Sequence, residues 1–411
     1  MRVTDTYLQN TFLSSLGRAK RTLVDLQTQV STGSKIQKTS DNPLSAARIN
    51  RLQNQLQNID TYSKNITNGQ NYLSSTTSAM EGMQNETQNI IDNLSTATNA
   101  ANKSLLSSFG DKVKQSLQAI VQYANTQVDG KYAFGGTNSS TAPYTQNSTW
   151  YGGGVDTSGA HSIKISSTIE QKINTTGEDL FQSVLKQTGT LDKSAAVGAV
   201  TQNSTQIQSA DGTVYNVNVT YTKTGPDAYS LKYQVKDTAG AVVSTTQNQL
   251  AFDPATGKLA TVDGVKTQKL SLDDKTNKIS FSIDASDLSE GSTSAVTASV
   301  TQPTNMLNAI QTIADQLSAG KMPSDAQLKM LNNFNDHLLQ KLSDAGAVQN
   351  RLTAASDMLQ SQQVQVTDLL SSEKDTDTAK AAIEIQTAQY TTEVLYKTSA
   401  MILPKSLIDY L

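Results

Sequence analysis

Apolar residues recur every seven positions at both ends of this chain, and the long region between them lacks the pattern. One heptad position of the N-terminal half carries Leu52, Ile59, Ile66, Leu73, Met80, Leu94 and Ala101, with only Thr87 breaking the series. Near the C-terminus the equivalent series is Leu331, Leu338, Ala345, Leu352, Leu359 and Val366. This spacing gives a helix one narrow apolar seam, which must be covered by a second helix. We therefore expect the two helices to pair antiparallel as a rod through Leu52, Ile59, Ile66, Leu73, Leu338, Leu352, Leu359 and Val366.

The companion seam position is polar in the middle of both predicted helices. It carries Ser63, Gln70, Thr77 and Gln84 in the first helix, and Asn335, Gln349, Ser356 and Gln363 in the second. Polar residues in a seam lower its stability but define which register and association state forms. We expect the register of the rod to be set by these side chains.

Shorter apolar series mark both termini. Residues 4–31 are predicted to be helical, as is a C-terminal segment with Ala381, Ala388, Leu395 and Ile402 at intervals of seven, which Pro404 should kink or end. Residues 1–60 carry eight basic and four acidic side chains, whereas residues 361–411 carry four basic and seven acidic ones. Opposite charge favours pairing of the two ends, although both faces could simply be solvated. The expected assembly residues are Phe12, Leu16, Leu23, Leu26, Val30, Ala388, Leu395 and Ile402.

Local signals set the expected helix boundaries. Gly33 suits a helix stop, and Pro43 suits the first helical position, from which a helix can run to about Ala101. A second helix is predicted over 105–128. Helix returns after Pro303 as a short piece to about Ala319, and a long helix starts near Ser324 and runs past Leu370.

The central region has the period of β-strands. Glycine-bounded residues 130–136 are predicted to form a strand or hairpin arm. Apolar residues alternate with polar ones at Tyr215, Val217, Val219 and Tyr221, at Tyr229, Leu231, Tyr233 and Val235, and at Ile279, Phe281 and Ile283.

These elements predict an α+β fold, in which an elongated antiparallel coiled-coil bundle of the N- and C-terminal regions carries an inserted β-rich domain. We expect three domains. The terminal helical, polymerising domain comprises residues 1–32 and 377–411. The long-helix rod with a small β-element comprises 33–180 and 301–376, and an outer β-rich domain comprises 181–300.

Composition and charge exclude several classes of function. Only 36% of the 411 residues are hydrophobic and 5% aromatic, which suits thin modules better than one thick core. A net charge of -3 argues against binding of nucleic acid. The sequence has no cysteine, no apolar run long enough to span a membrane, and no apolar stretch typical of a cleavable signal peptide. A chain of this kind fits export without a cleaved leader.

The sequence contains no arrangement typical of a catalytic or metal site. Its two histidines, His161 and His337, have no partner at metal-ligand spacing. The glycines at 135–136 and 152–154 lack the Lys-Ser/Thr of a phosphate-binding loop. Asp273 and Asp274 suit a turn, and Trp150 suits a packing anchor. We therefore expect no enzyme activity, no cofactor and no metal.

Several segments together resemble the bacterial flagellin superfamily. Residues 30–36 (VSTGSKI), followed by Ser40-Asp41-Asn42-Pro43, resemble the flagellin N-terminal signature. Residues 130–138 (GKYAFGGTN), Ala142-Pro143-Tyr144, Asp375-Thr376-Asp377 and the ending at 406–411 are more similar to hook-associated proteins of the hook–filament junction. The resemblance covers about 1–180 and 303–411, whereas 181–300 resembles no family. Pro404 departs from an uninterrupted terminal coiled coil.

The resemblance implies a structural subunit of the flagellum, exported through the flagellar type III pathway to the outside of the cell. Its implied partners are further copies of itself, the other hook–filament junction protein, flagellin and an export chaperone, with no nucleic acid and no membrane. The implied role is an adaptor that joins hook to filament and nucleates the filament. The alternatives are a filament-forming flagellin, a flagellin-like chain with an enzyme in its insertion, and a secreted coiled-coil adhesin or effector.

Overall fold

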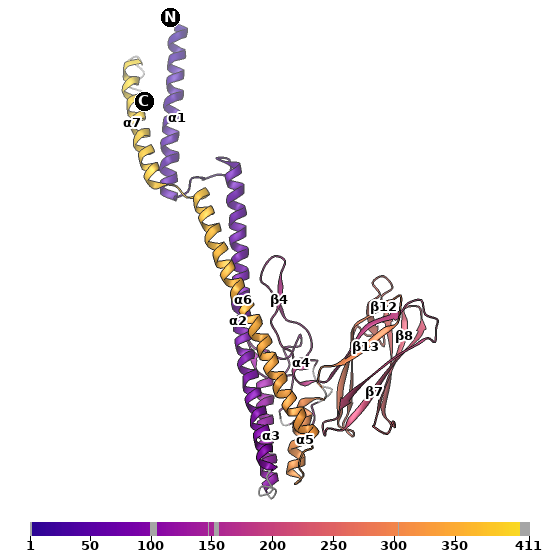
Figure 1. The fold of residues 1–411 in the computed structure, drawn as a ribbon. Helices are drawn as coiled ribbons and strands as arrows, with labels where there is room; N and C mark the ends of the chain where they lie inside the picture. The colour runs from indigo at the N-terminus through magenta and orange to yellow at the C-terminus, as the bar shows by residue number, and fades with distance from the viewer. Residues whose placement is uncertain (1, 99–104, 147, 152–155, 303, 403–411) are drawn as a thin grey trace. The chain divides into compact units, whose positions relative to one another are not determined.

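The computed structural model describes residues 2–98, 105–146, 148–151, 156–302 and 304–402, with helices towards both ends and strands between them (Figure 1). This arrangement confirms the α+β fold class. The helices are α1 (Arg2–Thr32), α2 (Pro43–Ala97), α3 (Leu106–Ala124), α4 (Gly177–Phe181), α5 (Met306–Ser318), α6 (Asp325–Lys374) and α7 (Thr378–Ile402). Close contacts divide the chain into two units, one of residues 1–65 and 354–411 and one of residues 66–353. Helices α2 and α6 run through both units.

Helices α2 and α6 pair antiparallel, as polar contacts across their seam demonstrate. In the first unit, the Arg48 guanidinium lies 3.0 Å from the Glu373 carboxylate. In the second, Gln70 Nε2 donates to Thr353 Oγ1 at 3.3 Å. Gln84 Nε2 donates to Asn335 Oδ1 at 3.2 Å. Two residues predicted at the polar seam position, one from each helix, therefore bond to each other, which restricts the register because a shift would leave both amides without this partner.

The start of α2 lies at Pro43, as predicted, and Asn42 caps it. Pro43 occupies the first helical position, and Asn42 accepts from the Ser45 amide through Oδ1 at 3.1 Å. The described helix extends to Ala97, and the predicted seam residue Ala101 lies outside the described residues.

Helix α3 ends earlier than predicted. The expectation of helix through residue 128 is wrong, because α3 ends at Ala124. Asn125 holds the chain at this point by donating from Nδ2 to the Tyr144 carbonyl (2.6 Å) and accepting from the Tyr144 amide (3.1 Å). Strands β1 (Gln127–Val128) and β2 (Lys131–Tyr132) then form a hairpin. Asp129 and Gly130 turn it with φ of 51° and 74°, the left-handed pair that favours an Asp-Gly hairpin.

Helices α3 and α5 pack antiparallel in the same unit. Gly110 permits their close approach, because a Cβ there would lie 2.7 Å from Ser318 Oγ and 2.8 Å from the Ser318 amide nitrogen. Lys114 reaches Asp315 at 3.4 Å in the same antiparallel sense. The apolar faces of both helices are buried, including Val113, Leu117, Ile310 and Ile313.

The region between α4 and α5 forms a sandwich of two sheets. One sheet has the order β10-β9-β8-β7-β6 and is antiparallel throughout. The other has the order β11-β12-β5-β13, in which β5 and β12 are parallel. A smaller sheet, β3 (Ser162–Lys164) with β4 (Glu170–Lys172), precedes α4. The sandwich strands are β5 (Val184–Asp192), β6 (Val200–Gln208), β7 (Val214–Gly225), β8 (Ala228–Lys236), β9 (Val242–Phe252), β10 (Leu259–Val262), β11 (Lys269–Asp274), β12 (Ile279–Gly291) and β13 (Ala295–Val300).

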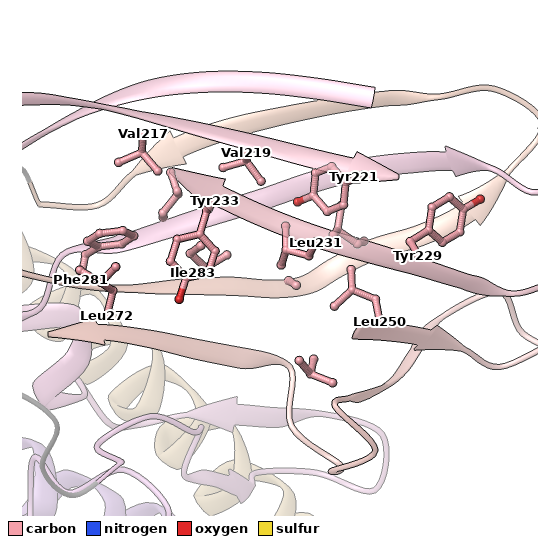
Figure 2. Packing of buried hydrophobic residues seen from close by; sticks show 14 of the residues in the cluster. Val217, Val219, Tyr221, Tyr229, Leu231, Tyr233, Leu250, Leu272, Phe281 and Ile283 are labelled. Atoms are coloured by element: carbon pink, nitrogen blue, oxygen red, sulfur yellow. The ribbon is translucent and has the colours of Figure 1, made fainter. Parts of the chain in front are cut away.

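The core of the sandwich includes the alternating residues of β7, β8 and β12, together with side chains of other strands such as Leu250 and Leu272. The predicted alternation is confirmed, because its apolar members are buried between the two sheets (Figure 2). They are Tyr215, Val217, Val219, Tyr221, Tyr229, Leu231, Tyr233, Val235, Ile279, Phe281 and Ile283. Each fully buried side chain of this size contributes about 1.5–3 kcal/mol, so the insertion has a core of its own.

Helix α4 is fastened to α6 by an aromatic contact and a histidine. The rings of Phe181 and Phe334 have centroids 5.9 Å apart. His337 Nε2 donates to the Asp179 carbonyl oxygen at 2.7 Å. Burial lowers the pKa of His337 below its ordinary 6.5, against the smaller opposing effect of that hydrogen bond.

A charge in the α2 seam should unfold the rod. Ile66 is 1% exposed, so Ile66→Asp removes a packed side chain and buries a carboxylate. We expect a loss of at least about 3 kcal/mol in the free energy of unfolding, measured by urea denaturation. Asn58→Asp, on the exposed side of the same helix, is the control and should be close to neutral. Equal losses in the two variants would contradict the seam.

Acidification should weaken the contact between α4 and α6. Because the folded chain lowers the pKa of His337, it binds protons less readily than the unfolded chain, and the free energy of unfolding falls as the pH drops below 6.5. His337→Gln keeps a donor for the Asp179 carbonyl but does not titrate. Relative to this variant, the native chain should lose stability below pH 6.5 in chemical denaturation series. Parallel pH curves for the two chains would show that His337 does not contribute.

Candidate assembly interface

The terminal helices α1 and α7 lie side by side and antiparallel in the first unit (Figure 1). Leu16 and Leu26 of α1 are buried, as are Ala381 and Thr392 of α7. Of the other predicted assembly residues, Phe12, Leu23, Ala388 and Leu395 are half-buried and Val30 is exposed. Ile402 ends α7, and its side chain and Pro404 lie outside what the structure describes. The pair therefore has a thin seam between its two helices.

A second apolar face of α7 points away from this seam. Ile383, Tyr390 and Val394 are 66%, 69% and 40% exposed. Each follows a seam-side residue (Ala381, Ala388 or Thr392) by two positions, and two residues advance about 200° around a helix. On α1, Leu13 and Val24 are also exposed and are eleven residues apart, so they share a face. We call Ile383, Tyr390 and Val394 the outer stripe.

Sequence reasoning did not identify the outer stripe. The heptad series through Ala381 accounts for one face of α7 and leaves the opposite face unassigned. The signal was nevertheless present, because Ile383, Tyr390 and Val394 are spaced by seven and four residues, which is the spacing of one helix face. A helix with two apolar faces needs cover on both, and within the described residues α1 covers only one.

Two short connections link the terminal helices to the long ones, and they bond to each other. Ser34 and Asp375 form an antiparallel bridge. The Lys35 amide donates to the Lys374 carbonyl at 2.7 Å, and the Thr376 amide donates to the Gly33 carbonyl at 2.9 Å. Gly33 has a φ of 70°, which lets the chain turn out of α1. We call residues 33–35 and 374–376 the clasp.

The clasp was only partly foreseen. The break at Gly33 was predicted, and the second break is the one at which Asp377 caps α7 by accepting from the Lys380 amide at 3.0 Å. The two breaks pair because α2 and α6 are antiparallel, which brings the start of α2 beside the end of α6. The clasp joins both terminal helices to the same end of this pair.

The predicted rod-pairing residues lie on the seam of α2 and α6. Leu52 is half-buried and all the others are buried, namely Ile59, Ile66, Leu73, Leu338, Leu352, Leu359 and Val366. A Cβ at Gly69 would lie 3.4 Å from Leu352 Cδ1, an ordinary packing distance across the seam, and 2.6 Å from Ile163 Cδ1 of β3, which packs closely on α2 at this point. Their burial is consistent with the predicted pairing of α2 and α6 within one chain.

The histidines have structural contacts. His161 packs edge-to-face against Tyr72 with centroids 5.5 Å apart, and His337 bonds to the backbone of α4. In the described parts of the chain, no group of three or more His, Asp or Glu side chains is placed to hold a metal ion. None of the described helices is both long and apolar enough to cross a membrane.

A polar cavity of about 350 Å³ lies where the sandwich meets α4, lined in part by Trp150, Glu178, Lys269 and Ser282. Burial raises the pKa of Glu178 above its ordinary value, against the opposing effect of Lys269. Glu178 and Lys269 form an ion pair with each other, and Trp150 Nε1 donates to Asp273 Oδ1 at 2.7 Å. The charged groups of the cavity thus serve contacts within the chain.

Comparison with known proteins places these features in a family. The bacterial flagellin N-terminal helical region matches residues 3–139, and the bacterial flagellin C-terminal helical region matches residues 328–411. None of the curated proteins searched matches the chain.

Solved structures with similar chains come from several bacteria. One described as a flagellar hook-associated protein from Vibrio parahaemolyticus is 14% identical, with 82% of this chain and 100% of that chain covered and a TM-score of 0.47. The flagellar junction protein FlgL from Legionella pneumophila is 15% identical (81% and 100% covered, TM-score 0.43). FlgL from Bacillus cereus is 13% identical (78% and 99% covered, TM-score 0.35).

The two regions matched by the flagellin family contain the helices that pair across the chain, α1 and α2 on one side and α6 and α7 on the other. Together they cover more than half of the sequence, and the chain belongs to the bacterial flagellin superfamily.

Proposed function

We propose that this chain is the adaptor subunit that joins the flagellar hook to the filament and nucleates filament assembly. As a member of the flagellin superfamily it is a structural protein of the flagellum. The observation that carries the proposal is the outer stripe of α7, an apolar surface that the helices described by the structure leave exposed. Such a surface suits a subunit that packs against further subunits through its ends.

The adaptor role, as distinct from that of filament flagellin, rests on the segments at 130–144 and at the C-terminus. The 130–144 segment is a structural support: Tyr72 Oη donates to the Ala133 carbonyl at 2.5 Å, and Phe134 and Tyr144 are buried. Its resemblance to junction proteins therefore concerns how this part of the rod is built. We propose copies of this chain, the other junction protein, flagellin and an export chaperone as partners.

We further propose that the protein acts outside the cell, after export without a cleaved signal peptide. The expected assembly residues at both ends (Phe12, Leu16, Leu23, Leu26, Val30, Ala388, Leu395 and Ile402) would pack both within one subunit and against its neighbours. The domain boundaries proposed above place polymerisation in residues 1–32 and 377–411, beyond the clasp.

The outer stripe should be needed for assembly and not for folding. Ile383→Ser combined with Tyr390→Ser changes only exposed side chains, so the free energy of unfolding should stay within about 0.5 kcal/mol of the native value. Self-association in sedimentation velocity should fall, and the variant should be exported without supporting attached filaments. The matched control replaces the exposed Gln389 and Thr391 by Ser on the same helix, at positions to either side of the stripe. Native self-association of the stripe variant would count against the interface.

A strain lacking the gene should make hooks without filaments and release flagellin into the medium. Electron microscopy of the cells and analysis of the medium measure both outcomes, and the native gene should restore attached filaments.

The copy number of the protein in sheared flagella distinguishes an adaptor subunit from a filament-forming flagellin, because an adaptor is scarce and a filament protein is abundant. Attached filaments in the deletion strain would reject the adaptor role, whereas high copy number with loss of all filaments would identify a flagellin.

A further inference from the structure

Two neighbouring segments of the chain, one entering the β-sandwich (β5–β13) and one leaving it, connect the sandwich to the rest of its unit. Ser183 Oγ donates to the Gln302 carbonyl at 2.8 Å, and the Thr301 amide donates to the Val184 carbonyl at 3.0 Å. Two connections that leave side by side would by themselves form a hinge. Other contacts must decide whether the sandwich swings on this hinge or is fixed.

The turn between β6 and β7 is docked on the first residues of α6. Gln327 Nε2 donates to the Ala210 carbonyl at 3.2 Å, and neither residue is exposed. Ser324 Oγ lies 3.4 Å from the Asp211 carbonyl. Gly212 has a φ of 90°, and a Cβ there would lie 2.9 Å from the Ala326 Cβ. The turn therefore approaches the helix as closely as a glycine allows.

Gln327 also caps α6. The Ser324 amide donates to Gln327 Oε1 at 2.9 Å, and the Gln327 amide donates to Ser324 Oγ at 3.3 Å. This is the reciprocal pattern of a capping box, in which Ser is followed three residues later by Gln or Glu. The side chain of Gln327 thus has two tasks: its oxygen starts the helix, and its nitrogen binds the insertion.

Two more contacts fasten the sandwich at other points. Lys269 of β11 pairs with Glu178 of α4, and both side chains are mostly buried. Asp273, at the other end of β11, accepts from Trp150 Nε1 at 2.7 Å. These contacts and the docked turn come from different elements and hold β11 on one side and the β6–β7 turn on the other.

We propose that the β-sandwich is a fixed strut and not a tethered domain, and that Gln327 is the positioning residue that locks it to the start of α6. The lock gives every copy of the chain the same sandwich orientation. This inference concerns the isolated chain and does not depend on the proposed adaptor role.

Gln327→Glu separates the two tasks of this side chain. Glu is equally suited to the capping box, so α6 still starts at the same place. A carboxylate has no proton to donate, however, and its second oxygen would face the Ala210 carbonyl in a buried site. The variant therefore loses the hydrogen bond to the Ala210 carbonyl but keeps helix α6. Circular dichroism measures whether the helix content is unchanged.

The orientation can be measured by spin labelling, because the chain contains no cysteine. Labels are attached to Ser204→Cys on β6 and Gln340→Cys on α6, both at exposed positions of one unit. Double electron–electron resonance should give a single narrow distance for the otherwise native chain. In Gln327→Glu at neutral pH we expect loss of the single distance and a broad distribution. Gln360→Glu, an exposed change of equal charge on the same helix, should keep the narrow distance.

Measuring the distance distribution of Gln327→Glu at acid pH distinguishes loss of this hydrogen bond from a general loss of stability. A protonated carboxyl can donate to the Ala210 carbonyl, and burial raises the pKa of such a group. The narrow distance should therefore return for Gln327→Glu at acid pH, whereas the native chain shows no such gain. A broad distribution in the native chain would overturn the fixed strut. A narrow one in Gln327→Glu at neutral pH, or no recovery in acid, would overturn the role of Gln327.

Discussion

The seam between α2 and α6 joins two segments that are separated in sequence by α3, the whole β-sandwich and α5. The entropy lost on closing a loop grows only with the logarithm of its length, so this separation costs little more than a short loop would. The intervening chain also folds on its own core and returns to its starting point, where Ser183 bonds to the Gln302 carbonyl. The insertion therefore reduces the effective length of the loop that the seam must close.

The position of the terminal helices follows from this pairing. Antiparallel packing places Arg48 beside Glu373, and the connections that leave α2 and α6 at that end are short. They meet as the clasp, with backbone bonds from Lys35 to Lys374 and from Thr376 to Gly33. Helices α1 and α7 then begin their pairing from a common origin. A register shift in the long seam would separate Ser34 from Asp375 and so would also affect the ends.

Much of this fold could be predicted because the relevant physics is local or periodic. Heptads at Ile59, Ile66 and Leu352 indicate a helix that needs a partner, and strict alternation from Tyr215 to Tyr221 indicates a half-buried strand. The end of α3 could not be predicted from periodicity, because Asn125 stops the helix by bonding to Tyr144, which is distant in sequence. The parallel pairing of β5 with β12 could not be predicted either, because neither strand has a sequence pattern that indicates its partner or the direction of pairing.

The assembly surface shows why contacts with other molecules are harder to read than contacts within the chain. Both sides of an internal seam are present in one sequence, so Gln84 can be matched with Asn335 and the match checked by spacing and register. The outer stripe supplies one side only. Ile383, Tyr390 and Val394 have helical spacing, but no described part of the chain covers them, and a search for paired heptads passes over them. The docking role of Gln327 was missed for a related reason: Ser324 and Gln327 have the recognisable spacing of a capping box, yet the partner of Gln327 Nε2 is the backbone carbonyl of Ala210. Backbone carbonyls are the same in every sequence. The role of a side chain that binds one can therefore be recognised only when the fold shows which carbonyl lies beside it.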